Sequence, residues 1–337
     1  MAACWVWRRL AYGVALAGFL ALNLGGFARA AGAAAIDPPE WSPFFAQVAA
    51  DPAPYALLEL PLFTEKGRGE DHYQLYQVVH GRPRFGGRYA RDHKLTNPDN
   101  FVKTAGLFRD LWLLDAPDAR RAAAYPAVDF LPRTDYATQG LAILNAYHVG
   151  YIVVYKAALS AGWHEAEFQR ILAQVLGPGV QPSYEDSLLR AYKVPAGPPA
   201  ADPLTLDTGD GWYPAETDAG GPFRWADATS PVRDGPPHAA DLYTLNLGAQ
   251  PLAVTLQATV FAFKEPRPVE VRLNGTLLTT LNLVPSAGPQ TLNLPIRLPP
   301  GRNTLAFSSP APPQPTGDPQ DARVLSFGVR AIQLLRK

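Results

Sequence analysis

The sequence predicts a small α/β domain with a mostly parallel sheet, followed by an antiparallel β-sandwich of the jelly-roll, galactose-binding-like type, behind an N-terminal membrane segment. The first observation is length, because 337 residues suggest two domains at roughly 100 to 200 residues per domain. The second is a change in the hydrophobic pattern, from helices alternating with strands to strands alone. The third is an uncharged apolar run near the N-terminus. We therefore divide the chain into 1–30, 36–194, 195–203 and 204–337.

The N-terminal segment is interpreted either as a signal peptide or as a membrane helix. Arg8-Arg9 precede the apolar run over residues 10–27, and Ala28-Arg29-Ala30 then supplies the small residues of a cleavage site. As a helix, the run is at the short end of the roughly 17 to 25 residues that span a bilayer. Paired arginines before the run orient the N-terminus toward the cytoplasm. We therefore expect the bulk of the chain outside the cytoplasm, anchored in the cell membrane, or secreted if cleaved after Ala30.

Composition excludes several classes of function. Lys+Arg and Asp+Glu both total 30, so there is no basic field to attract nucleic acid. Cys4 is the single cysteine, so it can form neither an intramolecular disulfide nor a cysteine metal cluster. His164-Glu165 begins like a zinc-protease motif, but Phe168 stands where the second histidine is required. We expect no zinc and no recognisable catalytic motif.

Helices and strands alternate up to about residue 194, which predicts the α/β domain. Ser42-Pro43 is typical of a helix start, because serine caps the helix and proline fits its first turn. Thr134-Asp135 can cap another helix, which is expected to run through Tyr147. Residues 151–155 are expected to form the central buried strand. We expect helices at 42–50, 73–79, 97–112, 134–147 and 163–176. We expect strands at 55–63, 149–155 and 187–194.

The Pro-rich residues 195–203 are expected to form a stiff linker, after which the pattern changes. Apolar and polar residues then alternate with a period of two, which is typical of half-buried strands. Asn274-Gly275 between two such runs indicates a hairpin turn. Several short strands in succession predict a sandwich, and their alternating runs are 252–260, 269–273, 292–298, 305–307 and 325–329.

The segment "HYQLYQVVHGRPRFGGR", residues 72–88, has two interpretations. In the first, a short helix ends at His80, which caps it, and the following arginines are solvated or paired with glutamates. In the second, a metal or acid–base cluster would make the chain a hydrolase that uses the region of His72 and His80. The structural interpretation is favoured, because the spacing specifies no geometry. The side chains of the second interpretation are Glu70, Asp71, His72, His80 and His93.

Aromatic and acidic side chains gather near the entry of the sandwich, over residues 209–225. Rings that are exposed can stack on sugars, and carboxylates can bind calcium, so a glycan contact and a calcium site are both hypotheses. Glycan contact requires at least one of the two tryptophans to be exposed. Alternatively, the rings fill the sandwich core. The aromatic residues are Trp212, Tyr213, Phe223 and Trp225, and the acidic ones are Asp207, Asp210, Glu216 and Asp218.

Several motifs together resemble a known family. The order "PPEW…FFAQVAADPAPYALLELPL", "YQLYQVVHGRPRFGGRYAR", "ILNAYHVGYIVVY" and "YEDSLLRAYKV" resembles the extracytoplasmic C-terminal region of bacterial multi-pass membrane proteins of the glycosyltransferase C type (YfhO-like and dolichyl-phosphate-mannose-transferase-like). Gly211-Trp212-Tyr213 and Arg224-Trp225 resemble the entry of the β-sandwich that follows in some of them. The resemblance makes His80, Gly81, Arg82 and Pro83 a family landmark.

The resemblance implies a non-catalytic role for this chain. In such enzymes the catalytic carboxylate is expected in the first extracytoplasmic loop of the membrane region, and this sequence holds at most one membrane segment. We therefore expect a non-catalytic extracytoplasmic module of a glycosyltransferase-like system, with the membrane, a glycan or a membrane glycosyltransferase as partners. The alternatives are a secreted carbohydrate-binding or adhesion protein and the hydrolase above.

Overall fold

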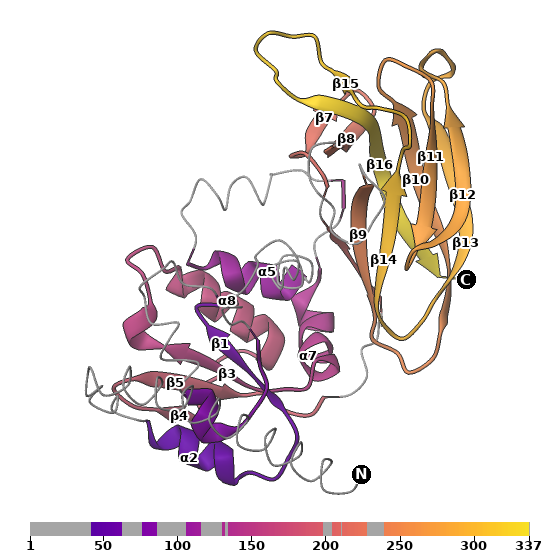
Figure 1. Cartoon of the computed structure of the whole chain (residues 1–337). Coiled ribbons are helices and arrows are strands. Elements are labelled where there is room, and N and C mark those ends of the chain that lie inside the picture. The colour runs from indigo at the N-terminus through magenta and orange to yellow at the C-terminus, as the bar shows by residue number, and fades with distance from the viewer. Residues whose placement is uncertain are drawn as a thin grey trace, which may run out of the picture.

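The computed structural model describes residues 42–62, 76–85, 106–115, 130–131, 134–197, 204–209, 211–227 and 239–336. Figure 1 shows an α/β unit, which holds the labelled helices, and a unit of long strands. Within the described ranges, no helix is long and apolar enough to cross a membrane. The apolar run at 10–27 lies outside these ranges, so the signal or anchor stays a prediction.

The sheet of the α/β unit is mixed, and the prediction of a mostly parallel sheet is wrong. Its strand order is β2-β1-β3-β5-β4. β1 pairs in parallel with β2 and β3, whereas β5 is antiparallel to both β3 and β4. The bounds are β1 Ala56–Leu60, β2 Arg84–Phe85, β3 Val149–Tyr155, β4 Tyr184–Glu185 and β5 Leu189–Lys193.

A tight turn between β4 and β5 explains the difference. Asp186 accepts hydrogen bonds from the backbone N–H groups of Leu188 and Leu189, at 2.8 and 2.9 Å. This turn reverses the chain after β4, so β5 inserts between β3 and β4. β3 is therefore the third of five strands, and the prediction of a central strand at 151–155 is confirmed.

Helices cover both faces of this sheet. In Figure 1, α2 lies on one side and α5, α7 and α8 on the other. Ser42 caps α2 and Asp135 caps α7 through their side-chain oxygens, which confirms both predicted helix starts. Buried apolar side chains fill the layers on each side of the sheet. The helix bounds are α2 Pro43–Ala50, α5 Gly106–Leu113, α7 Tyr136–Ala146 and α8 Glu165–Leu176, with the short η1 at Lys156–Ala158.

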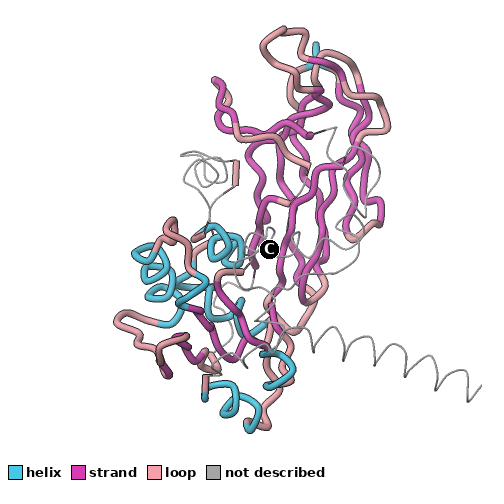
Figure 2. Tube along the Cα trace, turned by 60° about the vertical axis from the view of Figure 1, so that its left-hand side comes forward, coloured by secondary structure: helices cyan, strands magenta, loops and turns pink. Residues whose placement is uncertain are grey.

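The second unit is an antiparallel β-sandwich, as predicted. One sheet has the order β13-β10-β16-β8-β7, with β15 paired to β16, and the other has the order β12-β11-β14-β9-β6. Figure 2 shows that strands and loops build this unit apart from the short η2 at Pro285–Ala287. Its strands are β6 Leu204–Thr208, β7 Glu216–Asp218, β8 Gly221–Asp227, β9 Ala239–Asn246, β10 Leu252–Ala262, β11 Arg267–Leu273, β12 Thr276–Leu283, β13 Gln290–Leu298, β14 Gly301–Ser308, β15 Gln314–Pro315 and β16 Val324–Arg336.

Sequence patterning explains the sandwich strands. The alternating apolar residues of β10 face the other sheet and are buried, whereas their polar neighbours are half-buried or exposed. Asn274 and Gly275 have φ angles of 49° and 83° and connect β11 to β12. Positive φ at both positions is what a two-residue hairpin turn requires, so the predicted hairpin is confirmed.

The two units are in contact. Asp207 of β6 accepts a hydrogen bond from the backbone N–H of Gly106, at the start of α5, at 3.1 Å. Gln139 of α7 donates to the carbonyl of Leu204 at 2.7 Å. Phe130, which precedes α7 in the chain, packs in the sandwich core. The Pro-rich segment predicted as a spacer therefore joins two units that touch.

Candidate binding site on the outer face of the sandwich

Strand pairing separates the two tryptophans of the sandwich entry. Trp212 pairs with Ala226 across an antiparallel bridge, and Ala226 is fully buried in the sandwich core. Trp212 lies on this inner side, with its ring 5.3 Å from that of Phe130 and its indole N–H donating to the Asp241 carbonyl at 2.6 Å. Because neighbouring residues of a strand point to opposite faces, Trp225 lies on the outer side.

Four aromatic side chains form a cluster on that outer side, which we call the aromatic face: Phe223, Trp225, Phe261 and Phe263. The Trp225 ring is 5.1 Å from the Phe261 ring, 5.3 Å from the Phe263 ring and 5.5 Å from the Phe223 ring, each in an edge-to-face arrangement. Trp225, Phe261 and Phe263 are half-buried, whereas Phe223 is only 6% exposed. Of the rings predicted to contact glycan, Trp225 is therefore partly accessible, and Phe223 is the buried member of the cluster.

Gly328 provides the space for this cluster. It lies in register with Trp225 of β8 on one side and with Phe261 of β10 on the other. A Cβ atom at Gly328 would lie 2.3 Å from the Phe261 ring. The glycine therefore allows the Phe261 ring to lie across the middle strand beside Trp225.

A clamped arginine covers one end of the aromatic face. The Arg330 guanidinium carbon is 4.6 Å from the centre of the Phe261 ring and 5.4 Å from that of Phe223. Arg330 also donates to both oxygens of Asp218, at 2.7 and 2.9 Å. These hydrogen bonds lower the pKa of Asp218. The hairpin of β7 and β8 thereby fixes a cation against the rings.

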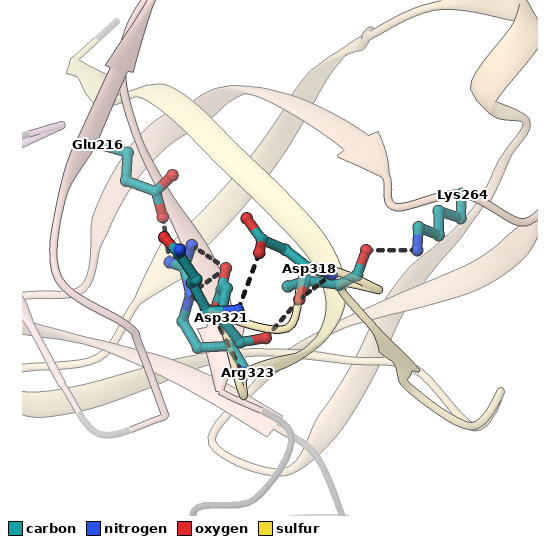
Figure 3. A network of polar contacts seen from close by, with 7 residues as sticks. Glu216, Lys264, Asp318, Asp321 and Arg323 are labelled. Carbon is teal, nitrogen blue, oxygen red and sulfur yellow. Dashed lines mark hydrogen bonds and ion pairs between the residues drawn. The ribbon is translucent and has the colours of Figure 1, made fainter.

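A polar network around Arg323 borders the other end of the aromatic face, and Figure 3 shows its contacts with Glu216 and Asp321. The Tyr213 backbone N–H donates to the Trp225 carbonyl at 2.9 Å, and the Arg323 guanidinium lies 5.5 Å from the Tyr213 ring centre. Arg323 forms ion pairs with Asp321, at 2.7 Å, and with Glu216. Its hydrogen bonds lower the pKa of Asp321. The bond to Trp225 places Tyr213, a predicted contact residue, next to the aromatic face, and its side chain is half-buried there.

The carboxylates predicted as calcium ligands do not converge. Asp207 is buried at the contact between the units, and Glu216 and Asp218 each form an ion pair with a different arginine. Asp210 lies outside the described residues. Over the ranges that the structure describes, no group of three or more His, Cys, Asp or Glu side chains could hold a metal ion.

Residues 80–83, the segment singled out by the sequence resemblance, form a clamp between elements of the α/β unit. Its parts contact the end of α2 and the edge of β1. The Arg82 guanidinium donates to the carbonyls of Val48 and Ala53, at 3.1 and 2.7 Å, and the Pro83 carbonyl accepts from Leu57 at 2.9 Å. Gly81, with a φ of 65°, allows the turn after the helical residues 76–80.

His80 is part of this clamp. Its ring is 4% exposed and stacks on Phe45 at 5.5 Å, and its Nδ1 accepts from the Arg82 backbone N–H at 3.0 Å. Burial, helped by the charges of Arg84 and Arg82, lowers the pKa of His80 to about 4. A buried, neutral imidazole that holds a loop supports the structural interpretation. The other members of the predicted hydrolase cluster, Glu70, Asp71, His72 and His93, lie outside the described residues.

Sequence reasoning missed part of the aromatic face. Phe261 and Phe263 lie far along the chain from Trp225, and only the pairing of β8, β16 and β10 brings them together. One signal was available: Phe261 falls on the polar side of the alternating pattern of β10, where packing against the other sheet does not require an aromatic ring.

Comparisons with known proteins add little. No family model matches the chain, and no curated protein matches it. Among solved structures, a family 35 carbohydrate binding module from Clostridium thermocellum is similar at 14% identity and a TM-score of 0.23, over 40% of this chain and 92% of that one. The CBM35 from Cellvibrio japonicus Abf62 is similar at 14% identity and a TM-score of 0.23, over 40% and 96%. The antiparallel sandwich is defined by the strand pairing of this chain itself.

Proposed function

We propose that this chain is a non-catalytic carbohydrate-binding protein whose sandwich contacts glycan through the aromatic face. The observation that carries the proposal is the cluster of half-buried rings on the outer side of a sheet, around Trp225. Apolar clusters in such positions mark interaction sites, because core packing does not account for them. Large flat rings with polar groups at their edges suit a sugar, which has both apolar faces and hydroxyl groups.

Polar groups at the borders of the aromatic face complete the proposed site. Glu216 and Asp218 are held in place by their ion pairs, and their oxygens can accept hydrogen bonds from sugar hydroxyls. A few fixed polar groups around an apolar surface orient a ligand. Because stacking on an open surface is weak and ordering the ligand has a cost, we expect dissociation constants on the order of micromolar to millimolar.

The location and partners of the chain are part of the proposal. The apolar run at 10–27 and the paired arginines before it support export of the bulk of the chain across the membrane. We propose that the chain then serves as a module of a glycosyltransferase-like membrane system, or as a secreted binding protein if the run is removed. The N-terminus of the mature protein, determined by mass spectrometry, separates these two forms.

Calorimetric titration of the full chain against a panel of neutral and envelope glycans tests the glycan contact. Trp225→Ala should abolish or weaken binding at least about tenfold, because it removes the central ring of the aromatic face. The folded state should persist, since Trp225 is half-buried. Trp163→Ala, in the α/β unit, is the matched control and should bind as the unmodified chain does.

Two results would contradict the proposal. One is equal binding by Trp225→Ala and the unmodified chain, which would place the glycan elsewhere. The other is the absence of binding to every glycan by a folded chain, which would leave the aromatic face as a protein-docking surface.

A further inference from the structure

We infer that the aromatic face selects neutral glycans and disfavours glycans that carry carboxylate groups. This inference rests on the proposed function, because it concerns the ligands of the same site. Its basis is the state of the charged side chains around the aromatic face, whose cations already bind carboxylates or carbonyls of the chain itself. A carboxylate ligand is held best by an arginine or lysine with donors to spare.

The guanidinium of Arg323 already binds two carboxylates. Its Nε donates to Asp321 at 2.8 Å, its Nη2 donates to the other oxygen of Asp321 at 2.7 Å, and its Nη1 donates to Glu216. Each of the three nitrogens therefore binds a carboxylate. Two carboxylates therefore compensate the single charge of Arg323, and an anionic sugar that bound its remaining N–H groups would lie beside both of them.

Arg330 and Lys264 also already have partners within the chain. Both terminal nitrogens of Arg330 donate to Asp218, and its Nε is buried. The Lys264 ammonium donates to the carbonyls of Pro315 and Thr316, at 3.0 and 2.6 Å. These contacts tie the loop before β16 to the end of the aromatic face at Phe263, whose ring centre is 5.1 Å from the ammonium.

Carboxylates outnumber cations around the aromatic face. Within β7, the turn after β10, β15 with the loop that follows it, and β16, the described anionic side chains are Glu216, Asp218, Glu265, Asp318 and Asp321, and the cationic ones are Lys264, Arg323, Arg330 and Arg336. Arg336, at the far end of β16, pairs with Val254 at the start of β10, whereas Phe261 lies near the end of β10. The border is therefore acidic, and it repels an anion while it accepts hydrogen bonds from neutral hydroxyl groups.

The test compares neutral and anionic probes of equal length on the full chain. Cellohexaose and mannohexaose are the neutral probes, and hexagalacturonate is the anionic one. Calorimetry at about 150 mM salt, where charges further apart than about 8 Å are screened, should show hexagalacturonate binding at least about tenfold more weakly than the better neutral probe. Equal or tighter binding of hexagalacturonate would overturn the inference and leave the glycan contact intact. Binding of no probe by the folded chain would overturn the proposed function itself.

A matched pair of variants tests whether the Asp218–Arg330 ion pair is what disfavours anionic glycans. Asp218→Asn removes the carboxylate that holds Arg330, so binding of hexagalacturonate should rise several-fold. Glu167→Gln likewise removes the carboxylate partner of Arg170, on α8 of the α/β unit, and should change nothing. A rise in both variants, or in neither, would contradict a role for the Asp218–Arg330 pair in selecting against anions.

Discussion

At the scale of single residues, His80 shows how a reactive side chain is used as a packing element. Its ring lies between Phe45 and the loop that contains Arg82, with one nitrogen accepting a hydrogen bond and the other buried. A protonated imidazole has no acceptor nitrogen and would place a charge beside Arg82 and Arg84. The fold therefore requires the neutral ring.

Because the fold requires a neutral His80, we expect the free energy of unfolding to fall in acid. The pKa of His80 is lowered from 6.5 to about 4 in the folded chain, so the unfolded state binds the proton first as pH falls. Stability is then full above the unfolded pKa and is lost as pH falls through the folded pKa. At about 1.4 kcal/mol per pKa unit, the loss between pH 6.5 and pH 4 is at most about 3 kcal/mol.

His80→Asn is the appropriate comparison. Asparagine can accept from the Arg82 N–H as Nδ1 does, but it does not titrate in this range. Chemical denaturation at several pH values should show the free energy of unfolding falling more steeply for the unmodified chain than for the variant. Parallel pH dependences would contradict a neutral, buried His80.

At the scale of elements, β8, β16 and β10 build the aromatic face only because the middle strand has a glycine. A Cβ atom in Gly328→Ala would meet the Phe261 ring at 2.3 Å, so the ring must move. We expect a cost of about 1 to 3 kcal/mol, as for other overpacked sites. In Phe261→Ala the obstacle is gone, and the same glycine substitution should cost much less there. Additive costs in a double-mutant cycle of the free energy of unfolding would contradict this coupling.

Elements that are determined by neighbouring residues could be predicted from the sequence, whereas the strand pairing of the mixed sheet could not. Helix caps at Ser42 and Asp135 and the Asn274-Gly275 turn are local, and all were predicted. The mixed sheet was not predicted, because β4 is only two residues long and its pairing is decided by a turn at Asp186. Local patterns do not report which strand a hairpin will join.

The sequence likewise could not predict which side of the sheet each sandwich tryptophan faces. Trp212 and Trp225 lie on different segments, and a shift of one residue in their pairing would exchange inside and outside. The structure pairs Trp212 with Ala226, which turns Trp212 inward against Phe130. The predicted group of rings thus divides between core and surface, with Trp225 and Tyr213 on the outer side.

At the scale of the whole molecule, the two units are joined by buried polar contacts. Asp207 is 6% exposed and contacts Gly106, with the guanidinium of Arg109 at 3.9 Å. These residues are about one hundred positions apart along the chain. Sequence periodicity describes one element at a time, so it could not predict this contact.

Asp207→Ala tests how strongly the contact stabilises the molecule. Removing the buried carboxylate leaves the Gly106 N–H without its acceptor and takes away one of the two carboxylates near Arg109, so we expect a loss of about 2 to 3 kcal/mol in the free energy of unfolding. Asp135→Ala is the control, because Asp135 also accepts from a helix N-terminus but within one unit. Its loss should be about 1 kcal/mol, the usual value for a cap. Similar losses in both variants would contradict a stabilising role for the contact between the units.

NMR of the two indole N–H groups of the sandwich tests whether glycan binds at the aromatic face. On titration of the full chain with the neutral hexasaccharide that calorimetry shows to bind best, the Trp225 indole signal should shift progressively. The Trp212 signal should stay in place, because its indole N–H is bonded to the Asp241 carbonyl on the inner side. A shift at Trp212, or glycan binding without a shift at Trp225, would contradict a glycan site on the aromatic face.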